Sequence, residues 1–136
     1  MIKGTQERRA WQEVQGMLFA VALDVSALAH SQRALEVARH AAAGCKGARL
    51  LLVTVVREGN EEARRAAQAA LAAHSDEGVV LLGDDPGKTL VAFVDAFAPH
   101  VLVVGTTEKT NLEQFVLGSV SQWCLDKAKC NVLVAR

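Results

Sequence analysis

The sequence predicts a single α/β domain with a doubly wound, five-stranded parallel sheet. The first observation is an alternation of five apolar runs with four helical patterns, which is typical of parallel β-α-β units with right-handed crossovers. The second is the length of 136 residues, which fits one domain of about 100–150 residues. The third is an apolar content of 51%, which is enough for a core and argues against disorder.

The first half of the domain alternates two strands with two helices. Residues 17–23 (MLFAVAL) and 48–56 (ARLLLVTVV) are continuous apolar runs, which favour strands buried on both faces. Between them, residues 31–43 place alanine and valine at i, i+3, i+4 and i+7, which predicts a helix with Ser26 or Ser31 as a candidate N-cap. Residues 60–74 begin with acidic residues and carry an Ala/Leu stripe, so they predict a second helix.

The second half continues the alternation. Residues 77–83 and 100–105 are predicted strands, and residues 84–98 between them predict a helix whose Asp-Asp-Pro start suits a cap and a first turn. A loop then leads into a fourth helix over 119–129 and a fifth strand over 131–136. No internal repeat interrupts this order.

Composition and charge exclude several classes of protein. Residues 1–16 are polar and lack the apolar stretch of a secretory signal, so we expect an N-terminal extension before a domain at 17–136. The formal net charge is zero and aromatic residues make up 4%, which argues against nucleic-acid partners. No run of 18 apolar residues is present, so we expect no membrane span. Three cysteines, an odd number, fit reduced thiols and a cytoplasmic location.

Two predicted strands end in residues that suit a ligand site. Asp24 follows the first strand, and its carboxylate can accept hydrogen bonds from ribose hydroxyls or an adenine amine. Gly105 ends the fourth strand and lets the backbone approach a ligand closely. Gly118 and Ser119 open the last helix, whose unpaired amides and positive dipole end suit an anion. If these strands are neighbours, the residues form a nucleotide pocket.

Helix capping is the alternative interpretation of the same residues. Ser119 followed by Gln122 fits a capping box, and Asp24 can equally cap the helix that follows it. Spacing alone leaves both interpretations open.

From about residue 17 to residue 136, the chain resembles a universal stress protein domain. The ATP-binding branch of that family carries G-x2-G-x9-G-[ST] after the fourth strand, and Gly105, Gly118 and Ser119 match this motif. Other similar segments occur in the family's order. They are the first strand with Asp24 and Ser26, the end of the second strand at 54–56, the turn at 83–86 and the last strand at 130–134.

The resemblance implies a fold, a ligand and an assembly. The fold is an adenine-nucleotide α-hydrolase-like sandwich with sheet order 3-2-1-4-5. The ligand is ATP or AMP, with or without Mg²⁺, and the assembly is a homodimer in which the last strand pairs antiparallel with its copy. An exposed apolar edge strand favours such pairing. The implied nucleotide-binding residues are Asp24, Val55, Val104, Gly105, Thr106, Thr107, Glu108, Gly118, Ser119 and Val120.

Glu108 departs from the family motif, which has its second glycine at this position. A glycine there can serve a positive φ or a close phosphate approach, which glutamate tolerates poorly. The carboxylate also repels a phosphate at about 4 Å, by about 1 kcal/mol in bulk water and about 4 kcal/mol at an effective dielectric near 20. We therefore expect weakened phosphate affinity, more for ATP than for AMP. Two alternatives stay open: Glu108 helps to hold Mg²⁺, or it points into solvent without effect.

Other motifs give weaker indications of a functional site. Residues 83–89 (GDDPGKT) resemble a Walker loop, but that motif would need glycine at Leu82. We therefore expect Lys88 and Thr89 in the first turn of the third helix, where they could still reach a phosphate. The cysteines and histidines lack the spacing of metal ligands, so no metal site is expected, and redox sensing by the cysteines is a minor alternative.

Three functions remain. The main one is a regulatory module of the stress response that binds an adenine nucleotide. The second is a domain of the same fold that has lost ATP and acts through dimerisation or a partner protein. The third is a slow ATPase, which is the weakest because the sequence offers no evident nucleophile–base pair or general base.

Overall fold

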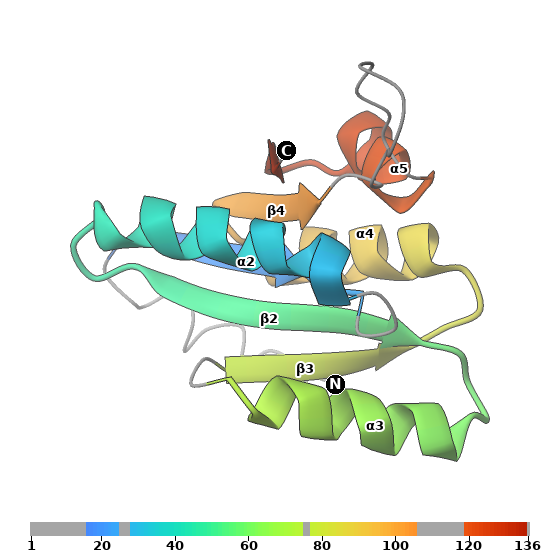
Figure 1. Cartoon of the computed structure of the whole chain (residues 1–136). Coiled ribbons are helices and arrows are strands. Elements are labelled where there is room, and N and C mark those ends of the chain that lie inside the picture. Colours follow the sequence, from blue (N-terminus) through green and yellow to red (C-terminus); the bar gives the residue numbers. More distant parts are fainter. Residues whose placement is uncertain (1–15, 25–27, 75–76, 106–118, 136) are drawn as a thin grey trace, which may run out of the picture.

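A computed structural model of the chain describes residues 16–24, 28–74, 77–105 and 119–135 (Figure 1). The predicted boundary at 16–17 falls at the start of these residues, and the extension before it lies outside them. The described residues form strands and helices in strict alternation. They are β1 (Leu18–Ala22), α2 (Leu28–Ala43), β2 (Arg49–Val56), α3 (Glu61–Ala72), β3 (Glu77–Leu82), α4 (Pro86–Phe97), β4 (Val101–Gly105), α5 (Ser119–Lys127) and β5 (Asn131–Ala135).

The strands form one parallel sheet in the order β3-β2-β1-β4-β5, which confirms the predicted architecture and order. From β1 the chain winds outward through β2 to β3, and it then crosses back to place β4 on the other side of β1. The winding direction therefore reverses between β1 and β4. In doubly wound sheets, ligands bind beyond the carboxyl ends of the strands at this reversal.

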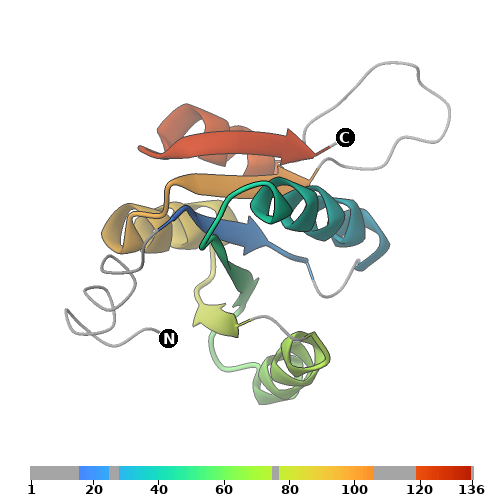
Figure 2. The same ribbon diagram turned by 90° about the vertical axis from the view of Figure 1, so that its left-hand side faces the viewer.

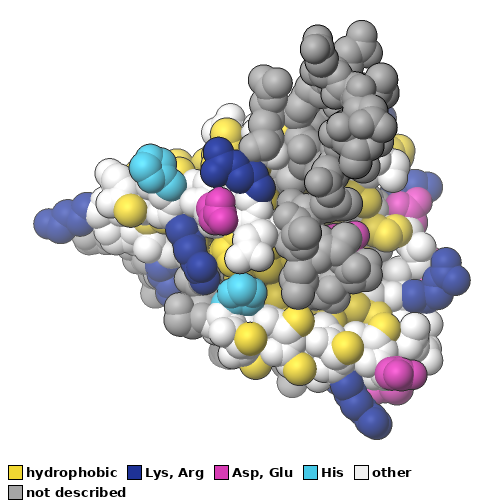
Figure 3. Space-filling model, viewed as in Figure 1, with side chains coloured by type: hydrophobic (Ala, Val, Ile, Leu, Met, Phe, Trp, Pro, Cys, Tyr) yellow, Lys and Arg dark blue, Asp and Glu magenta, His cyan; other side chains and the backbone are white. Residues whose placement is uncertain are grey.

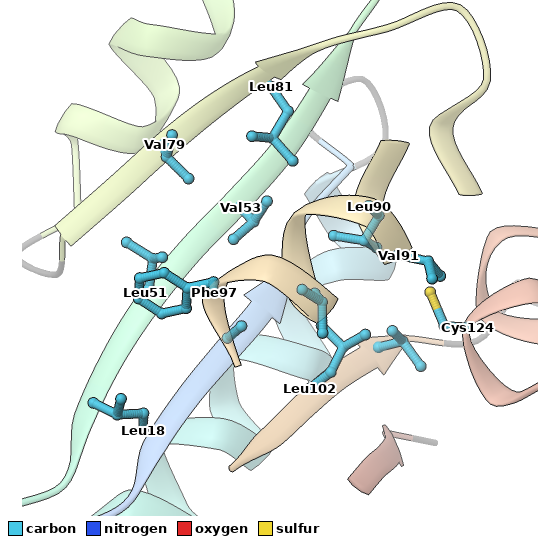
Figure 4. Packing of buried hydrophobic residues seen from close by; sticks show 13 residues of the cluster. Leu18, Leu51, Val53, Val79, Leu81, Leu90, Val91, Phe97, Leu102 and Cys124 are labelled. Atoms are coloured by element: carbon cyan, nitrogen blue, oxygen red, sulfur yellow. The ribbon is translucent and has the colours of Figure 1, made fainter. Parts of the chain in front are cut away.

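Helices cover both faces of the sheet, and each face has its own core (Figures 1 and 2). On one face, Ala34 and Ala38 of α2 and Leu71 of α3 pack against strand residues such as Leu52. On the other face, α4 and α5 supply the helical side chains. This second cluster contains Leu18, Ala20, Leu51, Val53, Val79, Leu81, Leu90, Val91, Val94, Phe97, Leu102, Val104 and Cys124 (Figure 4).

Burial on both faces explains the continuous apolar runs of the sequence. Neighbouring side chains along a strand point to opposite faces, and Leu52 and Val53 of β2 are both fully buried although they belong to different clusters. Burying one such side chain contributes about 1.5–3 kcal/mol. The central strands β1 and β2 are therefore apolar on both faces, whereas the edge strand β5 alternates between exposed and half-buried residues.

The start of α4 follows the predicted cap, the start of α3 has a cap that was not predicted, and the start of α2 differs from the prediction. Asn60 caps α3, and Asp85 caps α4 by accepting the Lys88 backbone N–H at 3.1 Å, with Pro86 in the first turn. Helix α2 begins at Leu28, so Ser31 lies inside the helix and is not its N-cap, while the other candidate, Ser26, lies outside the described residues. The Ser31 side chain bonds to the end of the preceding strand instead, as described below.

No helix in the described part of the chain has the length and apolar character that a membrane span requires.

Candidate functional site

Three candidate residues meet at the carboxyl edge of neighbouring strands. Ala22 pairs with Val53 and Val21 pairs with Val103. The Leu23 N–H donates to the Val53 carbonyl at 2.8 Å, which continues the β1–β2 pairing beyond the end of β1. Extending the two registers by two residues places Asp24 level with Val55, and Leu23 level with Gly105. Asp24, Val55 and Gly105 therefore lie along one edge, where the winding direction reverses.

A buried serine fixes the chain at Asp24. The Asp24 N–H donates to Ser31 Oγ at 2.6 Å, and the same hydroxyl donates to the Asp24 carbonyl oxygen at 3.3 Å. Ser31 lies in the first turns of α2 and is only 5% exposed, whereas Asp24 is exposed. The two bonds hold the backbone of Asp24 to α2 and leave the Asp24 residue at the surface.

A second serine ties β4 to α5. Ser121 Oγ donates to the Gly105 carbonyl oxygen at 2.6 Å, across 16 positions of sequence. Ser121 is buried in the first turn of α5, and its neighbour Ser119 is exposed at the start of the helix. The bond therefore brings the two ends of the glycine motif, Gly105 and Ser119, to the same edge of the sheet.

The helix start at Ser119 retains the properties of an anion site. The first amides of an α-helix have no partner within the helix, and its dipole is positive there. Gln122 donates to the Asp126 carboxylate at 3.1 Å, which points its side chain along the helix and not back to Ser119. The capping box considered for these residues is therefore not formed. Val120 is half-buried and packs against the cluster under α4 and α5.

The two valines of the predicted site differ in exposure. Val55 is half-buried at the edge of the core, while Val104 is 1% exposed and pairs with Val134 in the sheet. The Val104 side chain is thus part of the core and has no free surface for a ligand. The other predicted residues, Thr106, Thr107, Glu108 and Gly118, lie outside the described residues.

Sequence reasoning missed the roles of Ser31 and Ser121. Both lie on buried helix stripes, Ser31 three residues before Ala34 and Ser121 three before Cys124. A buried hydroxyl needs a hydrogen-bond partner, so a serine on an apolar stripe was the signal that could have identified these anchors.

Cys124 and Cys130 lack the character of reactive thiols. Burial, and then the charge of nearby Cys130, raise the pKa of Cys124 to about 11. Burial also raises the pKa of Cys130. Both thiols stay protonated at neutral pH, and the thiolate is the reactive form. Within the described ranges, no group of three or more His, Cys, Asp or Glu side chains could hold a metal ion.

Charges of both signs are interspersed on the face seen in Figure 3. On that face, the described side chains offer no field of one sign that would attract a polyanion, in keeping with the zero net charge.

Comparison with known proteins gives a consistent family. The model of the universal stress protein family matches residues 57–136. A universal stress protein of Methanocaldococcus jannaschii is 39% identical over 51 residues, which are 38% of this chain and 30% of that protein's length.

Solved structures share the fold. A universal stress protein in complex with cAMP is 29% identical, with a TM-score of 0.60, over 89% of this chain and 97% of that chain. A family member from Arabidopsis thaliana with AMP bound is 19% identical, with a TM-score of 0.55, over 88% of this chain and 90% of its own. At that lower identity the similarity supports the fold alone.

Proposed function

Because the chain belongs to the universal stress protein family, we propose that it binds an adenine nucleotide and acts as a regulatory module of the stress response. The observation that carries this proposal is the 29% identical relative, which covers 89% of this chain and was solved with cAMP. The nucleotide would lie at the carboxyl edge between β1 and β4.

The described residues provide groups for both ends of an adenine nucleotide. Asp24 would accept hydrogen bonds from the adenosine part, and the backbone at Val55, level with it, would border the base. Gly105 would let the ribose approach the chain, and the exposed start of α5 at Ser119 would receive the phosphate. The anchoring bonds of Ser31 and Ser121 hold these parts in place before a ligand arrives.

Residues outside the described ranges complete the proposed site. Thr106, Thr107 and Gly118 would border the phosphates together with Val120. Glu108 would weaken the binding of phosphate groups by charge repulsion, so ATP would lose more affinity than AMP. Mg²⁺ held between Glu108 and the phosphates would reverse that order.

Calorimetric titration of AMP tests the role of the Asp24 edge. Asp24→Asn keeps the size of the side chain and removes the charge, and we expect it to weaken AMP binding about 10-fold or more, as for a lost charge-assisted hydrogen bond. Asp126→Asn is the matched control, because Asp126 is an exposed aspartate near the far end of α5. Equal affinities of AMP for the two variants would overturn the assignment of Asp24.

We further propose a homodimer in the cytoplasm, with β5 paired antiparallel to its copy. β5 is an edge strand of the sheet, and its Leu133 is 37% exposed. Edge strands with apolar side chains tend to become paired or covered. Light scattering at micromolar concentration should give the mass of two chains, and a monomer mass would contradict the dimer. Dimerisation without nucleotide binding would favour an interaction module that has lost its ligand.

A further inference from the structure

Two lysines contact the ring of one tryptophan, and one of them, Lys88, belongs to the Walker-like segment at 83–89. The ammonium group of Lys88 lies 5.7 Å from the centroid of the Trp123 ring, and that of Lys127 lies 5.6 Å from it. Trp123 is half-buried between α4 and α5, and both lysines are exposed. Gly87 allows this packing, because a Cβ there would lie 3.1–3.3 Å from three Trp123 atoms.

No carboxylate of the described residues lies within 4.0 Å of either ammonium group. Asp85, the acidic residue closest to Lys88 along the helix, caps α4 through the Lys88 backbone N–H. The indole face is thus the contact that holds the Lys88 charge. An exposed cation–π contact is weak, and a charge-assisted bond to a phosphate is stronger. Lys88 can therefore exchange the ring for an anion.

Lys88 also lies in the first turn of a helix that begins at the edge proposed for the phosphates. Helix α4 follows β3 and α5 follows β4, so both helices begin at the carboxyl edge of the parallel sheet. Trp123 comes four residues after Ser119, which is a rise of about 6 Å along the helix. Lys127 comes eight residues after Ser119, a rise of about 12 Å. The two lysines contact the same ring, but Lys88 lies in the first turn of α4, at this edge, whereas Lys127 lies in the last turn of α5.

We propose that Lys88 is a specificity-determining residue that contacts the β- and γ-phosphates of an adenosine di- or triphosphate. In the free protein and with AMP or cAMP, its ammonium group stays on the Trp123 ring. With ATP it moves to the outer phosphates, which extend beyond the Ser119 amide. This inference rests on the proposed function, since it requires a nucleotide at the β1–β4 edge.

Titration of three ligands into matched variants tests the proposal. AMP, ADP and ATP are titrated calorimetrically into the full chain and into Lys88→Met, Lys88→Arg and the control Lys127→Met. Lys88→Met should lower ATP affinity about 10- to 100-fold and AMP affinity by no more than about twofold. Lys88→Arg should retain most of the ATP affinity because it keeps the charge. Lys127→Met should change neither ligand selectively.

Tryptophan emission gives a second readout that does not depend on the Lys88 variants. The chain has two tryptophans, so Trp11→Phe leaves Trp123 as the reporter. Saturation with ATP should change its emission as the ammonium group leaves the ring, and saturation with AMP should not.

Three results would overturn the role of Lys88. They are equal losses of ATP and AMP affinity in Lys88→Met, equal ATP losses in Lys88→Met and Lys127→Met, or an unchanged Trp123 emission on saturation with ATP. A wild-type chain that binds neither AMP nor ATP would instead overturn the proposed function itself, and the absence of any AMP heat distinguishes that failure.

Discussion

The Ser121 hydroxyl donates a 2.6 Å hydrogen bond to the carbonyl oxygen of Gly105 and joins the start of α5 to the end of β4. These residues are 16 positions apart, and the bond brings the two ends of the glycine motif to one edge. It therefore links the packing of α5 to the geometry of the proposed site.

Removing this bond should destabilise the fold. Ser121→Ala leaves the Gly105 carbonyl without its partner, and we expect a loss of about 1–3 kcal/mol of unfolding free energy in urea titrations. Ser119→Ala is the control, because Ser119 is exposed and should change stability by no more than about 0.5 kcal/mol. Equal stabilities of the two variants would show that the Ser121 bond contributes nothing.

Gly83 should not tolerate a side chain. A Cβ at this position would lie 2.1 Å from Thr89 Oγ1, and the short Thr89 side chain cannot retreat far. We expect Gly83→Ala to lower the unfolding free energy by about 1–3 kcal/mol, as overpacking does. Gly44→Ala is the control, since its Cβ would meet its nearest atom at an ordinary 3.7 Å. Thr89→Ala should reduce the penalty of Gly83→Ala, and a purely additive double variant would contradict the clash.

His100 holds the start of β1 to the start of β4. Its Nδ1 accepts the Leu18 N–H at 2.9 Å, and its backbone N–H donates to the Leu18 carbonyl, also at 2.9 Å. His100→Ala should lower the unfolding free energy by about 1 kcal/mol through the loss of the side-chain bond. His100→Asn, whose amide oxygen can accept from the same N–H, should recover part of this loss. An alanine variant as stable as the wild type would contradict the role of the ring.

Cys124 should resist alkylation in the native protein. With a pKa of about 11, its thiolate fraction at pH 7 is about one in ten thousand. We expect iodoacetamide labelling, mapped by mass spectrometry, to leave Cys124 unmodified at pH 7 and to modify it in the unfolded chain.

The raised pKa of Cys124 determines the direction in which stability changes with pH. The folded-state pKa of about 11 lies above the ordinary thiol value of 9.0. The Cys124 contribution to stability is therefore complete below pH 9 and is lost as the pH rises toward 11, because the unfolded chain ionises first. Cys124→Ala lacks this thiol, so its unfolding free energy should fall less between pH 7 and pH 11 than that of the wild type. Rapid native labelling at pH 7, or an unchanged alkaline loss in the variant, would contradict the burial of the thiol.

Local patterns predicted the elements of this fold better than their anchors. The strands were evident because residues such as Leu52 and Val53 are buried on opposite faces, which leaves an unbroken apolar run. The strand order came from the family resemblance, because pairing between distant segments leaves no local pattern. Ser31 was predicted as an N-cap because a serine before an apolar stripe is ambiguous. Its actual partner, Asp24, is fixed only once β1 and α2 are packed together.

Part of the candidate site could also be predicted from the sequence, and part could not. Asp24 and Gly105 could be inferred from strand ends, since parallel strands bring their carboxyl ends to one edge. Val55 came from the family resemblance. The contact between Lys88 and Trp123 could not be inferred, because it depends on how closely α4 approaches α5.

Adenine-nucleotide binding is tested most directly by calorimetric titration of AMP, and of ATP with Mg²⁺, into the wild type and Glu108→Gly. We predict that the wild type binds AMP and that Glu108→Gly strengthens ATP binding by about one to three decades, as expected from about 1–4 kcal/mol of charge repulsion. Failure of both proteins to bind either nucleotide would contradict the proposed site at the β1–β4 edge.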